Sequence, residues 1–183
     1  MRIITGSARG VRLETLEGNA TRPTTEFVKE AVFSMIQFDL EERRVLDLFA
    51  GSGQMGLEAL SRGAAMATLV DRNPAAVNVI KRNAQKCRLY DRCRILSSEW
   101  ESFVRGNAGR ERFDVIFLDP PYADNSIGRI LRRLCEADMI ADNGLIVCES
   151  DSEEEFCAEG LCVLRHKKYG RIYITLLTKE AAL

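Results

Sequence analysis

The chain has 183 residues, of which 46% are hydrophobic, and its formal net charge at pH 7 is -1. This length suits one domain with a substantial core, and the composition is typical of a globular protein. The small net charge excludes binding to nucleic acid through a general positive field, so any such binding must depend on local patches. Two basic patches occur, one at Arg2, Arg9 and Arg12 and one within residues 72–94, and an acidic run occupies residues 149–155.

The cysteines and the N-terminal residues indicate where the protein works. Six cysteines are scattered without a C-x-x-C pair, and His166 is the one histidine, so we expect reduced thiols and no metal site. The sequence starts without a long apolar segment, and it contains no run of about 18 apolar residues. We therefore expect a cytoplasmic protein with no membrane partner.

The first predicted element is an N-terminal β-hairpin. Short β-like runs at residues 2–5 and 11–16 flank a glycine-containing turn, which predicts a protruding hairpin with arginines near its tip. Arg22-Pro23-Thr24-Thr25 then ends this element and caps a helix, in which apolar residues recur at helical spacing from Phe27 to Ile36.

From Val45 onward, predicted strands and helices alternate. Strands are predicted at residues 45–50, 67–71, 93–97, 114–118, 144–149, 161–166 and 171–178. Helices are predicted at residues 53–62, 74–88, 99–105, 126–137 and 152–158. This alternation predicts an α/β fold of Rossmann-like type, with a mostly parallel seven-stranded sheet covered on both faces. The last two strands are joined by a segment too short for a crossover, so they are predicted to form an antiparallel hairpin. We expect one domain, with residues 1–20 as the hairpin extension and 21–183 as the core.

Asp119-Pro120-Pro121-Tyr122 follows the apolar strand at 114–118 and is the most informative motif of the chain. Two prolines end the strand rigidly and leave carbonyl groups free, because neither proline has an N–H. A carboxylate or carbonyl beside an aromatic ring can hold a planar amine by hydrogen bonds and stack the ring attached to it. The motif therefore predicts a site for an amino group, and the alternative is a strand-ending turn with a buried tyrosine.

Gly51, Gly53 and Gly56 follow the first parallel strand and form a G-x-G-x-x-G turn, and Asp71 ends the next strand. This pattern fits a dinucleotide site equally well, which makes an NAD-dependent oxidoreductase a competing hypothesis. Asp71 is placed to accept hydrogen bonds from ribose hydroxyls under either hypothesis.

Asp47 distinguishes the two hypotheses because it places a carboxylate inside the first strand, where burial without a partner is costly. S-adenosylmethionine carries an ammonium and a sulfonium and has no pyrophosphate, so it suits this position better than a dinucleotide does. The helix N-terminus after Gly53 would take the methionine carboxylate. The alternative for Asp47 is a structural aspartate that accepts hydrogen bonds from backbone amides.

Glu99 and Trp100 follow the third strand. Glu99 is a candidate acceptor for the adenine amino group, with Trp100 packed nearby. The alternatives are an acid at a helix start and an aromatic residue of the core.

Taken in order, these segments resemble the class I methyltransferases and, within them, the bacterial ribosomal small-subunit methyltransferase D family. The resemblance covers nearly the whole chain and rests on five segments: Arg2-Ile3-Ile4 with Gly10, Arg22-Pro23-Thr24, residues 47–53, residues 56–63 and Asp119-Pro120-Pro121-Tyr122. It implies methylation of N2 of a guanine in 16S rRNA of the small ribosomal subunit, with S-adenosylmethionine as cofactor.

The resemblance also implies roles for individual residues. The cofactor would be bound by Arg22, Thr24, Asp47, Phe49, Gly51, Ser52, Gly53, Asp71, Arg72, Glu99 and Trp100. The base would be held by Asp119, Pro120, Pro121 and Tyr122, which would form the catalytic group. Arg2, Arg9 and Arg12 would contact the RNA, and we expect a monomer that needs no metal.

Two other classes of amine methyltransferase carry such a tetrapeptide, namely DNA adenine-N6 and protein glutamine methyltransferases. The chain has no room for the large target-recognition domain expected of a DNA methyltransferase. A non-catalytic RNA-binding module is disfavoured because it would have no use for carboxylates at both Asp47 and Asp119.

Overall fold

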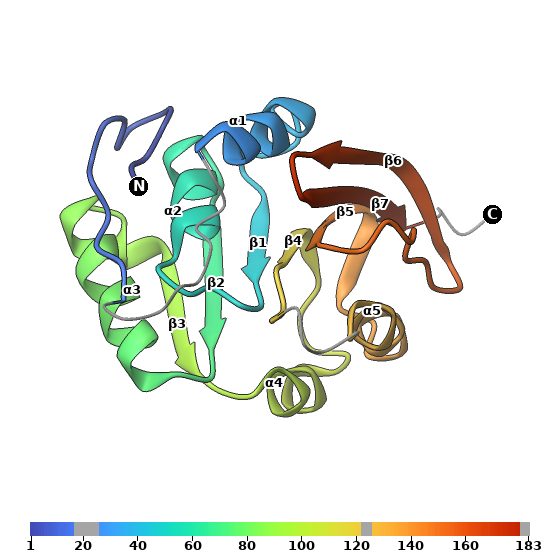
Figure 1. Ribbon diagram of the computed structural model, residues 1–183. Coiled ribbons are helices and arrows are strands. Elements are labelled where there is room, and N and C mark those ends of the chain that lie inside the picture. Colours follow the sequence, from blue (N-terminus) through green and yellow to red (C-terminus); the bar gives the residue numbers. More distant parts are fainter. Residues whose placement is uncertain (17–25, 122–125, 180–183) are drawn as a thin grey trace.

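The computed structural model describes residues 1–16, 26–121 and 126–179, and in this part of the chain a seven-stranded sheet forms the centre (Figure 1). The strands are β1 (Arg44–Asp47), β2 (Met66–Asp71), β3 (Cys93–Ser97), β4 (Phe113–Leu118), β5 (Ile140–Ser150), β6 (Leu161–Tyr169) and β7 (Ile172–Lys179). Their order across the sheet is β3-β2-β1-β4-β5-β7-β6. Strands β1 to β5 are parallel, and β7 runs antiparallel to both β5 and β6. The predicted Rossmann-like sheet and its antiparallel C-terminal hairpin are confirmed.

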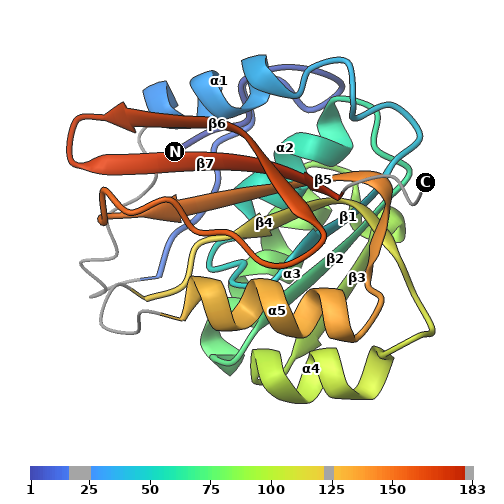
Figure 2. The same ribbon diagram turned by 90° about the vertical axis from the view of Figure 1, so that its right-hand side faces the viewer.

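The helices lie on both faces of this sheet, as the alternating pattern predicted (Figures 1 and 2). They are α1 (Glu26–Met35), α2 (Gln54–Ser61), α3 (Pro74–Lys86), α4 (Trp100–Asn107) and α5 (Ile127–Glu136), with a single 3₁₀ turn at Tyr90–Arg92. Successive strand residues point to opposite faces. Val45 and Val115 therefore pack in one core with α1, α2 and α3, whereas Leu46 and Ile116 pack in the other core with α4 and α5.

Two predicted elements differ from the structure in the second half of the chain. The helix predicted at residues 152–158 is wrong, because this segment has no regular structure. The side chain of Ser152 accepts a hydrogen bond from the amide of Glu154, and such local bonds compete with helix formation. Strand β5 begins at Ile140, earlier than predicted, with a register irregularity opposite Phe113 and Val115.

The predicted N-terminal β-hairpin is also wrong, since residues 1–16 form one isolated bridge between Arg2 and Arg12 and no strand. The segment lies against α2 and does not protrude. Glu58 of α2 accepts hydrogen bonds from the amides of Ile4 and Thr5, at 2.8 and 3.0 Å. Some backbone hydrogen bonds still join the two runs, such as that from the Ile3 amide to the Val11 carbonyl, but the amides of Ile4 and Thr5 bind a helix side chain instead of a partner strand.

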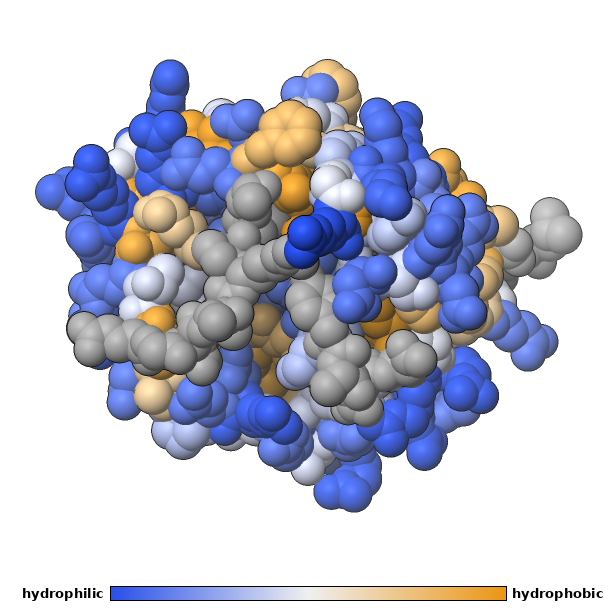
Figure 3. Space-filling model, viewed as in Figure 1, coloured by the Kyte–Doolittle hydropathy of each residue, from blue (hydrophilic) through white to orange (hydrophobic). Residues whose placement is uncertain are grey.

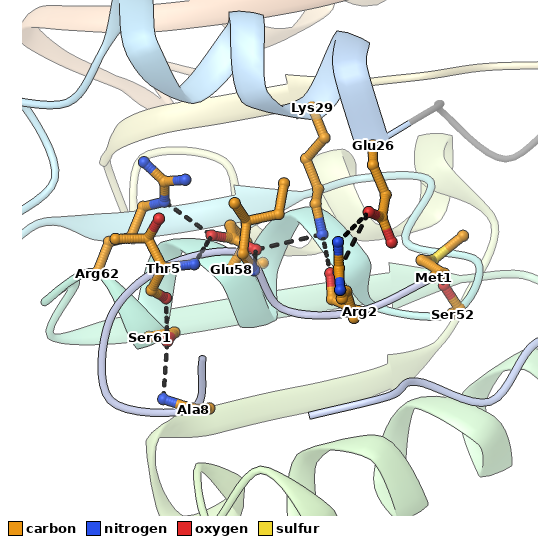
Figure 4. Close-up of polar contacts among 12 residues, drawn as sticks. Met1, Arg2, Thr5, Ala8, Glu26, Lys29, Ser52, Glu58, Ser61 and Arg62 are labelled. Atoms are coloured by element: carbon orange, nitrogen blue, oxygen red, sulfur yellow. Dashed lines mark hydrogen bonds and ion pairs between the residues drawn. The ribbon is translucent and has the colours of Figure 1, made fainter. Parts of the chain in front are cut away.

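A buried ion pair joins this N-terminal segment to α1 and α2 (Figure 4). The Lys29 ammonium lies 3.2 Å from Glu58, and both side chains are fully buried. Lys29 also donates to the backbone carbonyl of Arg2, and Arg62 donates to Glu58 at 2.8 Å. Burial lowers the pKa of Lys29, while the Glu58 carboxylate opposes that shift. Three parts of the chain that are distant in sequence are thus held by one carboxylate.

No helix in the described ranges is long and apolar enough to cross a membrane. This finding concerns helices alone.

We predict that Glu58→Ala lowers the free energy of unfolding by about 3–5 kcal/mol, because it leaves the buried ammonium of Lys29 without its partner. Chemical denaturation monitored by circular dichroism measures this change. The control is Glu30→Ala on the exposed side of α1, for which we expect a change within about 0.5 kcal/mol. A similar small loss for both variants would contradict the structural role of Glu58.

Candidate active site

A cavity of about 1070 Å³ lies at the carboxyl edge of the parallel strands. Its lining includes residues that end or follow each of the strands β1 to β5. Open α/β sheets bind ligands at this edge, because the loops that leave neighbouring strands diverge there. The cavity is therefore the candidate site, and most of the residues predicted from the sequence lie in it.

The turn between β1 and α2 forms one wall of the cavity. Gly51 and Gly53 adopt φ angles of +54° and +80°, which other residues rarely adopt. A Cβ atom on Gly56 would lie 2.3 Å from the Leu69 side chain, so this glycine allows α2 to pack closely on β2. A Cβ atom on Gly51 would meet nothing within 4 Å, which leaves the backbone of this cavity residue open to close approach by a ligand.

Asp47 ends β1 and is almost fully buried beneath this turn. Its carboxylate accepts a hydrogen bond from the amide of Gly56 at 3.2 Å, and a further backbone hydrogen bond from Phe49 favours its charged form. Burial nevertheless raises the pKa of Asp47 to about 7. The alternative interpretation, an aspartate bonded to backbone amides, is therefore correct for the geometry. The raised pKa shows that these amides do not fully offset the cost of the buried charge.

Gln54, the first residue of α2, also lines the cavity. Its Oε1 atom is buried and has no hydrogen-bond partner in the described residues. Buried acceptors are normally satisfied, because an unpaired one costs about 1–3 kcal/mol. An acceptor without a donor and a carboxylate with a raised pKa in one cavity fit a ligand that carries a charged N–H donor.

Asp71 ends β2 and has a defined orientation. One carboxylate oxygen accepts from the amide of Gly51 and the other from the amide of Asn73, each at 2.8 Å. Each oxygen keeps a second lone pair, so the carboxylate can still accept from a pair of hydroxyls. Arg72 and Ser52 lie in the same lining, and the Ser52 hydroxyl donates to the sulfur of Met1 at 3.4 Å.

Glu99 and Trp100 lie where β3 passes into α4. Glu99 is the exposed N-cap residue of the helix, and its backbone carbonyl accepts from the amide of Phe103. Trp100 is buried in the second core, with the Arg129 guanidinium 5.1 Å from its ring centre. Both residues also line the cavity. Trp100 is thus both a core residue and a cavity residue, and Glu99 is both a residue at a helix start and a cavity residue.

Asp119 follows β4 and faces the cavity, together with Pro120 and Pro121. Its side chain is exposed to the cavity, while the protein packed around the carboxylate removes part of its hydration. Burial and the nearby carboxylates of Glu149 and Asp47 raise its pKa well above its usual range. Asp119 therefore lies in an environment that favours proton uptake. Tyr122, the last residue of the motif, lies outside the described residues.

Glu149 is a cavity residue that the sequence analysis did not assign. It lies in β5, next to Cys148, which pairs with Leu118 of β4, so Glu149 and Asp119 are neighbours on adjacent strands. It is 6% exposed. An available signal was its position: like Asp119, it directly follows an apolar run, Leu145 to Cys148, whereas the acids after it are exposed. Within the acidic run at residues 149–155, Glu149 is therefore the buried acid.

The arginines predicted to contact RNA are not grouped at the cavity. Arg2 is exposed and ion-paired with Glu26 at 3.2 Å. Arg9 and Arg12 are exposed, and the turn before Arg9 contacts Ser61, at the end of α2 far from the cavity. Their contact with RNA stays a prediction. Arg22 and Thr24 lie outside the described residues.

The charge of the cavity lining is strongly negative. Among the described lining residues, one basic side chain, Arg72, stands against six acidic ones: Asp47, Asp71, Glu99, Glu101, Asp119 and Glu149. A pyrophosphate would be repelled by this set, whereas a cationic ligand would be attracted.

Comparison with known proteins agrees with the fold. The family model described as Conserved hypothetical protein 95 matches residues 1–178. YlbH of Bacillus subtilis is 38% identical over 183 residues, covering 98% of this chain and 100% of YlbH. Ribosomal RNA small subunit methyltransferase D of Haemophilus influenzae is 33% identical over 173 residues, covering 93% of this chain and 89% of its own length. The solved structure of YhhF from Escherichia coli superposes with a TM-score of 0.89 at 32% identity and covers 100% of this chain and 99% of its own.

The strand order and the acidic cavity at the carboxyl edge define a class I methyltransferase fold. Within this class, the chain belongs to the Conserved hypothetical protein 95 family, that of the ribosomal RNA small subunit methyltransferases D.

We predict that Asp47→Asn changes how stability depends on pH. In the folded protein Asp47 holds its proton up to a pH of about 7, while in the unfolded chain it releases that proton near pH 3.8. The folded state therefore binds more protons in this window, and the wild-type protein loses stability as the pH rises. The variant lacks this loss. The difference between its free energy of unfolding and that of the wild type should therefore increase by up to about 1.4 kcal/mol per pH unit as the pH rises.

Urea denaturation at a series of pH values between 4 and 7 measures this difference. The exposed Asp91→Asn variant serves as the control and should follow the wild-type pH dependence. Parallel curves for Asp47→Asn and the wild type would show that Asp47 is ionised across the whole range.

Proposed function

We propose that this protein uses S-adenosylmethionine to methylate the exocyclic N2 amine of a guanine in 16S rRNA of the small ribosomal subunit. The observation that carries the proposal is the arrangement of the cavity. A buried carboxylate and an unpaired acceptor lie at the glycine turn, and Asp119-Pro120-Pro121 lies at the neighbouring strand ends. The ribosomal substrate comes from membership of a family that contains ribosomal RNA small subunit methyltransferases D.

The residues of the first wall suit the cofactor. Asp47 and Gln54 would accept from its ammonium, which would restore the charged state of Asp47. The open backbone at Gly51 and the N-terminus of α2 would take its carboxylate. Asp71 would accept from the ribose hydroxyls and Glu99 from the adenine amine, as the resemblance implied. When bound, the sulfonium supplies an electrophilic methyl group.

The residues after β4 suit the target amine. The lone pair of a guanine N2 is delocalised into the ring, so it must be localised toward the methyl carbon before it can attack. Asp119 and the carbonyl of Pro120 would accept the two N–H bonds and hold the nitrogen in that geometry. Stacking of the base would fall to Tyr122. The target base must leave its neighbours to enter the cavity.

The transfer forms one N–C bond and breaks the S–C bond of the sulfonium, and the amine then loses one proton. Asp119 is suited to receive that proton, because burial and the charge of Glu149 raise its pKa. The negative lining would also stabilise positive charge that develops on the amine during transfer. The cavity thus provides positioning, electrostatic stabilisation and a proton acceptor.

The experiment that tests the function identifies the methylated product. The protein is incubated with isotope-labelled S-adenosylmethionine and, separately, with undermethylated small ribosomal subunits, free 16S rRNA, duplex DNA and total protein. We expect label in N2-methylguanosine from the ribosomal samples. Label in N6-methyladenine or methylglutamine would replace the substrate and keep the chemistry, while no label in any sample would reject the methyltransferase proposal.

We predict that Asp119→Ala lowers kcat for RNA methylation by about 100-fold or more, because the variant neither positions the amine nor accepts its proton. Binding of S-adenosylmethionine, measured by calorimetry, should stay nearly unchanged. Asp71→Ala should show the reverse order, with weakened cofactor binding first. Equal loss of binding and turnover in Asp119→Ala would contradict the assigned role.

We further predict that Glu149→Gln shifts the pH dependence of kcat. Asp119 must be ionised to accept the N–H bonds, and the carboxylates of Glu149 and Asp47 both raise its pKa. Removing one of these charges lowers that pKa, so the acid limb of the pH profile should move to lower pH. The matched control is Glu154→Gln, which removes the same charge from an exposed position of the following segment. An unmoved limb in Glu149→Gln would exclude coupling between the two acids.

A further inference from the structure

The β6–β7 hairpin carries a basic surface that the sequence analysis did not assign. Residues 161–178 contain no Asp or Glu, and they contain Arg165, Lys167, Lys168 and Arg171. All four side chains are exposed. In a protein with a formal net charge of -1 and an acidic cavity, such a segment concentrates positive charge at one place.

The register of the sheet places this surface beside the cavity. Ser150, at the end of β5, pairs with Tyr173, and Tyr169 pairs with Ile172, so the β6–β7 turn lies at the carboxyl edge of the parallel strands. Figure 2 shows this turn on the same side of the molecule as the end of β4 and the start of α1. The turn, which includes Arg171, therefore borders the opening toward which Asp119 faces.

One row of residues crosses the sheet from the site to the hairpin. Glu149 pairs with Ile174, and Ile174 pairs with Lys167. Glu149 and Ile174 both line the cavity. Adjacent strands lie about 4.8 Å apart, so the three spacings from β4 to β6 put Lys167 about 14 Å from the position of Asp119. A single RNA strand can span this interval with its target base in the cavity.

The two faces of the hairpin differ. Arg165 and Lys167 pair with Leu176 and Ile174, which belong to the core beneath α1, so they lie on the α1 face of the sheet. Lys168 lies on the other face, where its ammonium is 5.0 Å from the Tyr173 ring centre. The pKa of Lys168 is raised by its hydrogen bond to Tyr173 and by the carboxylate of Glu153.

The acidic segment after β5 belongs to the second face. Phe156 and Ala158 pack against the core beneath α4 and α5, which places the segment opposite α1. Glu153 of this segment acts on Lys168, which lies on the same face. Figure 3 shows hydrophilic side chains gathered over the part of the surface where Figure 1 places β6 and β7.

Aromatic rings accompany the charges on the α1 face. Phe27 of α1 is 66% exposed, and its ring meets the edge of Tyr169 at a centroid distance of 6.0 Å. The Lys167 ammonium lies 5.8 Å from the Tyr169 ring centre. Cations that contact phosphates, next to an aromatic face on which a base stacks, are the combination that binds single-stranded nucleic acid.

We propose that Lys167, Arg171 and the exposed ring of Phe27 form a docking surface for a single RNA strand that flanks the target base. This proposal rests on the proposed function, because it assigns the surface that delivers RNA to the same cavity. The lysine and arginine neutralise phosphates of the flanking nucleotides, and Phe27 stacks a neighbouring base. A base that must leave its neighbours has its backbone splayed into a single strand, which suits this surface better than a duplex.

The test compares salt-dependent binding of a guanine-containing single-stranded RNA oligonucleotide and of undermethylated small ribosomal subunits. For Lys167→Ala/Arg171→Ala we expect binding of the oligonucleotide about tenfold weaker at physiological salt. The slope of log Kd against log salt should fall by about 0.7 per lost phosphate contact, so by about 1.4 in total. Phe27→Ala should also weaken binding about tenfold, but with an unchanged slope, because stacking releases no counterions.

Arg105→Ala/Arg110→Ala is the matched control, since it removes two exposed arginines at and beyond the end of α4, on the opposite edge of the sheet. It should keep the wild-type slope. Both double variants should bind S-adenosylmethionine as the wild type does, and Lys167→Ala/Arg171→Ala should raise KM for ribosomal subunits more than it lowers kcat.

The outcomes separate this inference from the proposed function. If the wild-type protein methylates RNA but Lys167→Ala/Arg171→Ala keeps the wild-type salt slope, the docking surface alone is overturned. An equal loss of slope in the control variant would also overturn it. If Lys167→Ala/Arg171→Ala bound polyglutamate more weakly but RNA as tightly as the wild type, the surface would bind an acidic protein. This result would also overturn the RNA docking surface. A wild-type protein that neither binds nor methylates RNA overturns both proposals.

Discussion

The structure depends on the crowding of carboxylates at one edge of a sheet. Each of the five parallel strands ends at or close to an acid, namely Asp47, Asp71, Glu99, Asp119 and Glu149. Parallel pairing brings all five strand ends to the same edge, so these acids share one cavity. Burial, and after it the repulsion from neighbouring carboxylates, raises the pKa of Asp47 and of Asp119. The cavity therefore favours the binding of positive charge. A sulfonium cofactor and an amine that becomes cationic would both carry such a charge.

The N-terminal segment adds a second constraint through Glu58. This carboxylate binds two backbone amides of the segment, the ammonium of Lys29 and the guanidinium of Arg62. The first residue of the segment, Met1, and two residues near its other end, Thr15 and Leu16, line the cavity. The contacts between Glu58 and the N-terminal segment thus hold residues that line the cavity, although Glu58 itself is not in the lining. A segment that we expected to protrude as a hairpin is instead part of the body of the protein.

The distribution of charge would let a protein with an acidic cavity bind the polyanionic substrate that we propose. A negative cavity would repel the phosphates of RNA, although it suits the cofactor and the amine. The β6–β7 hairpin separates the two requirements, because it places exposed cations about three strand spacings from Asp119. In the proposed complex, the base would enter the acidic cavity while its backbone would stay on the basic rim. A net charge close to zero is therefore compatible with binding to nucleic acid through a local surface.

The order of strands and helices from Val45, the glycine turn, and the acids at Asp47, Asp71 and Asp119 could all be predicted from the sequence, because hydrophobic periodicity and turn residues act locally. Which residues meet depends on how distant strands pair. Glu149 belongs with Asp119 because β4 and β5 pair in one register, and Lys167 belongs near the cavity because β7 is inserted between β5 and β6. The N-terminal runs resembled strands, yet a single bridge joins them in the described structure, while the amides of Ile4 and Thr5 bind Glu58 of a distant helix. Long-range pairing of this kind leaves no local pattern in the sequence.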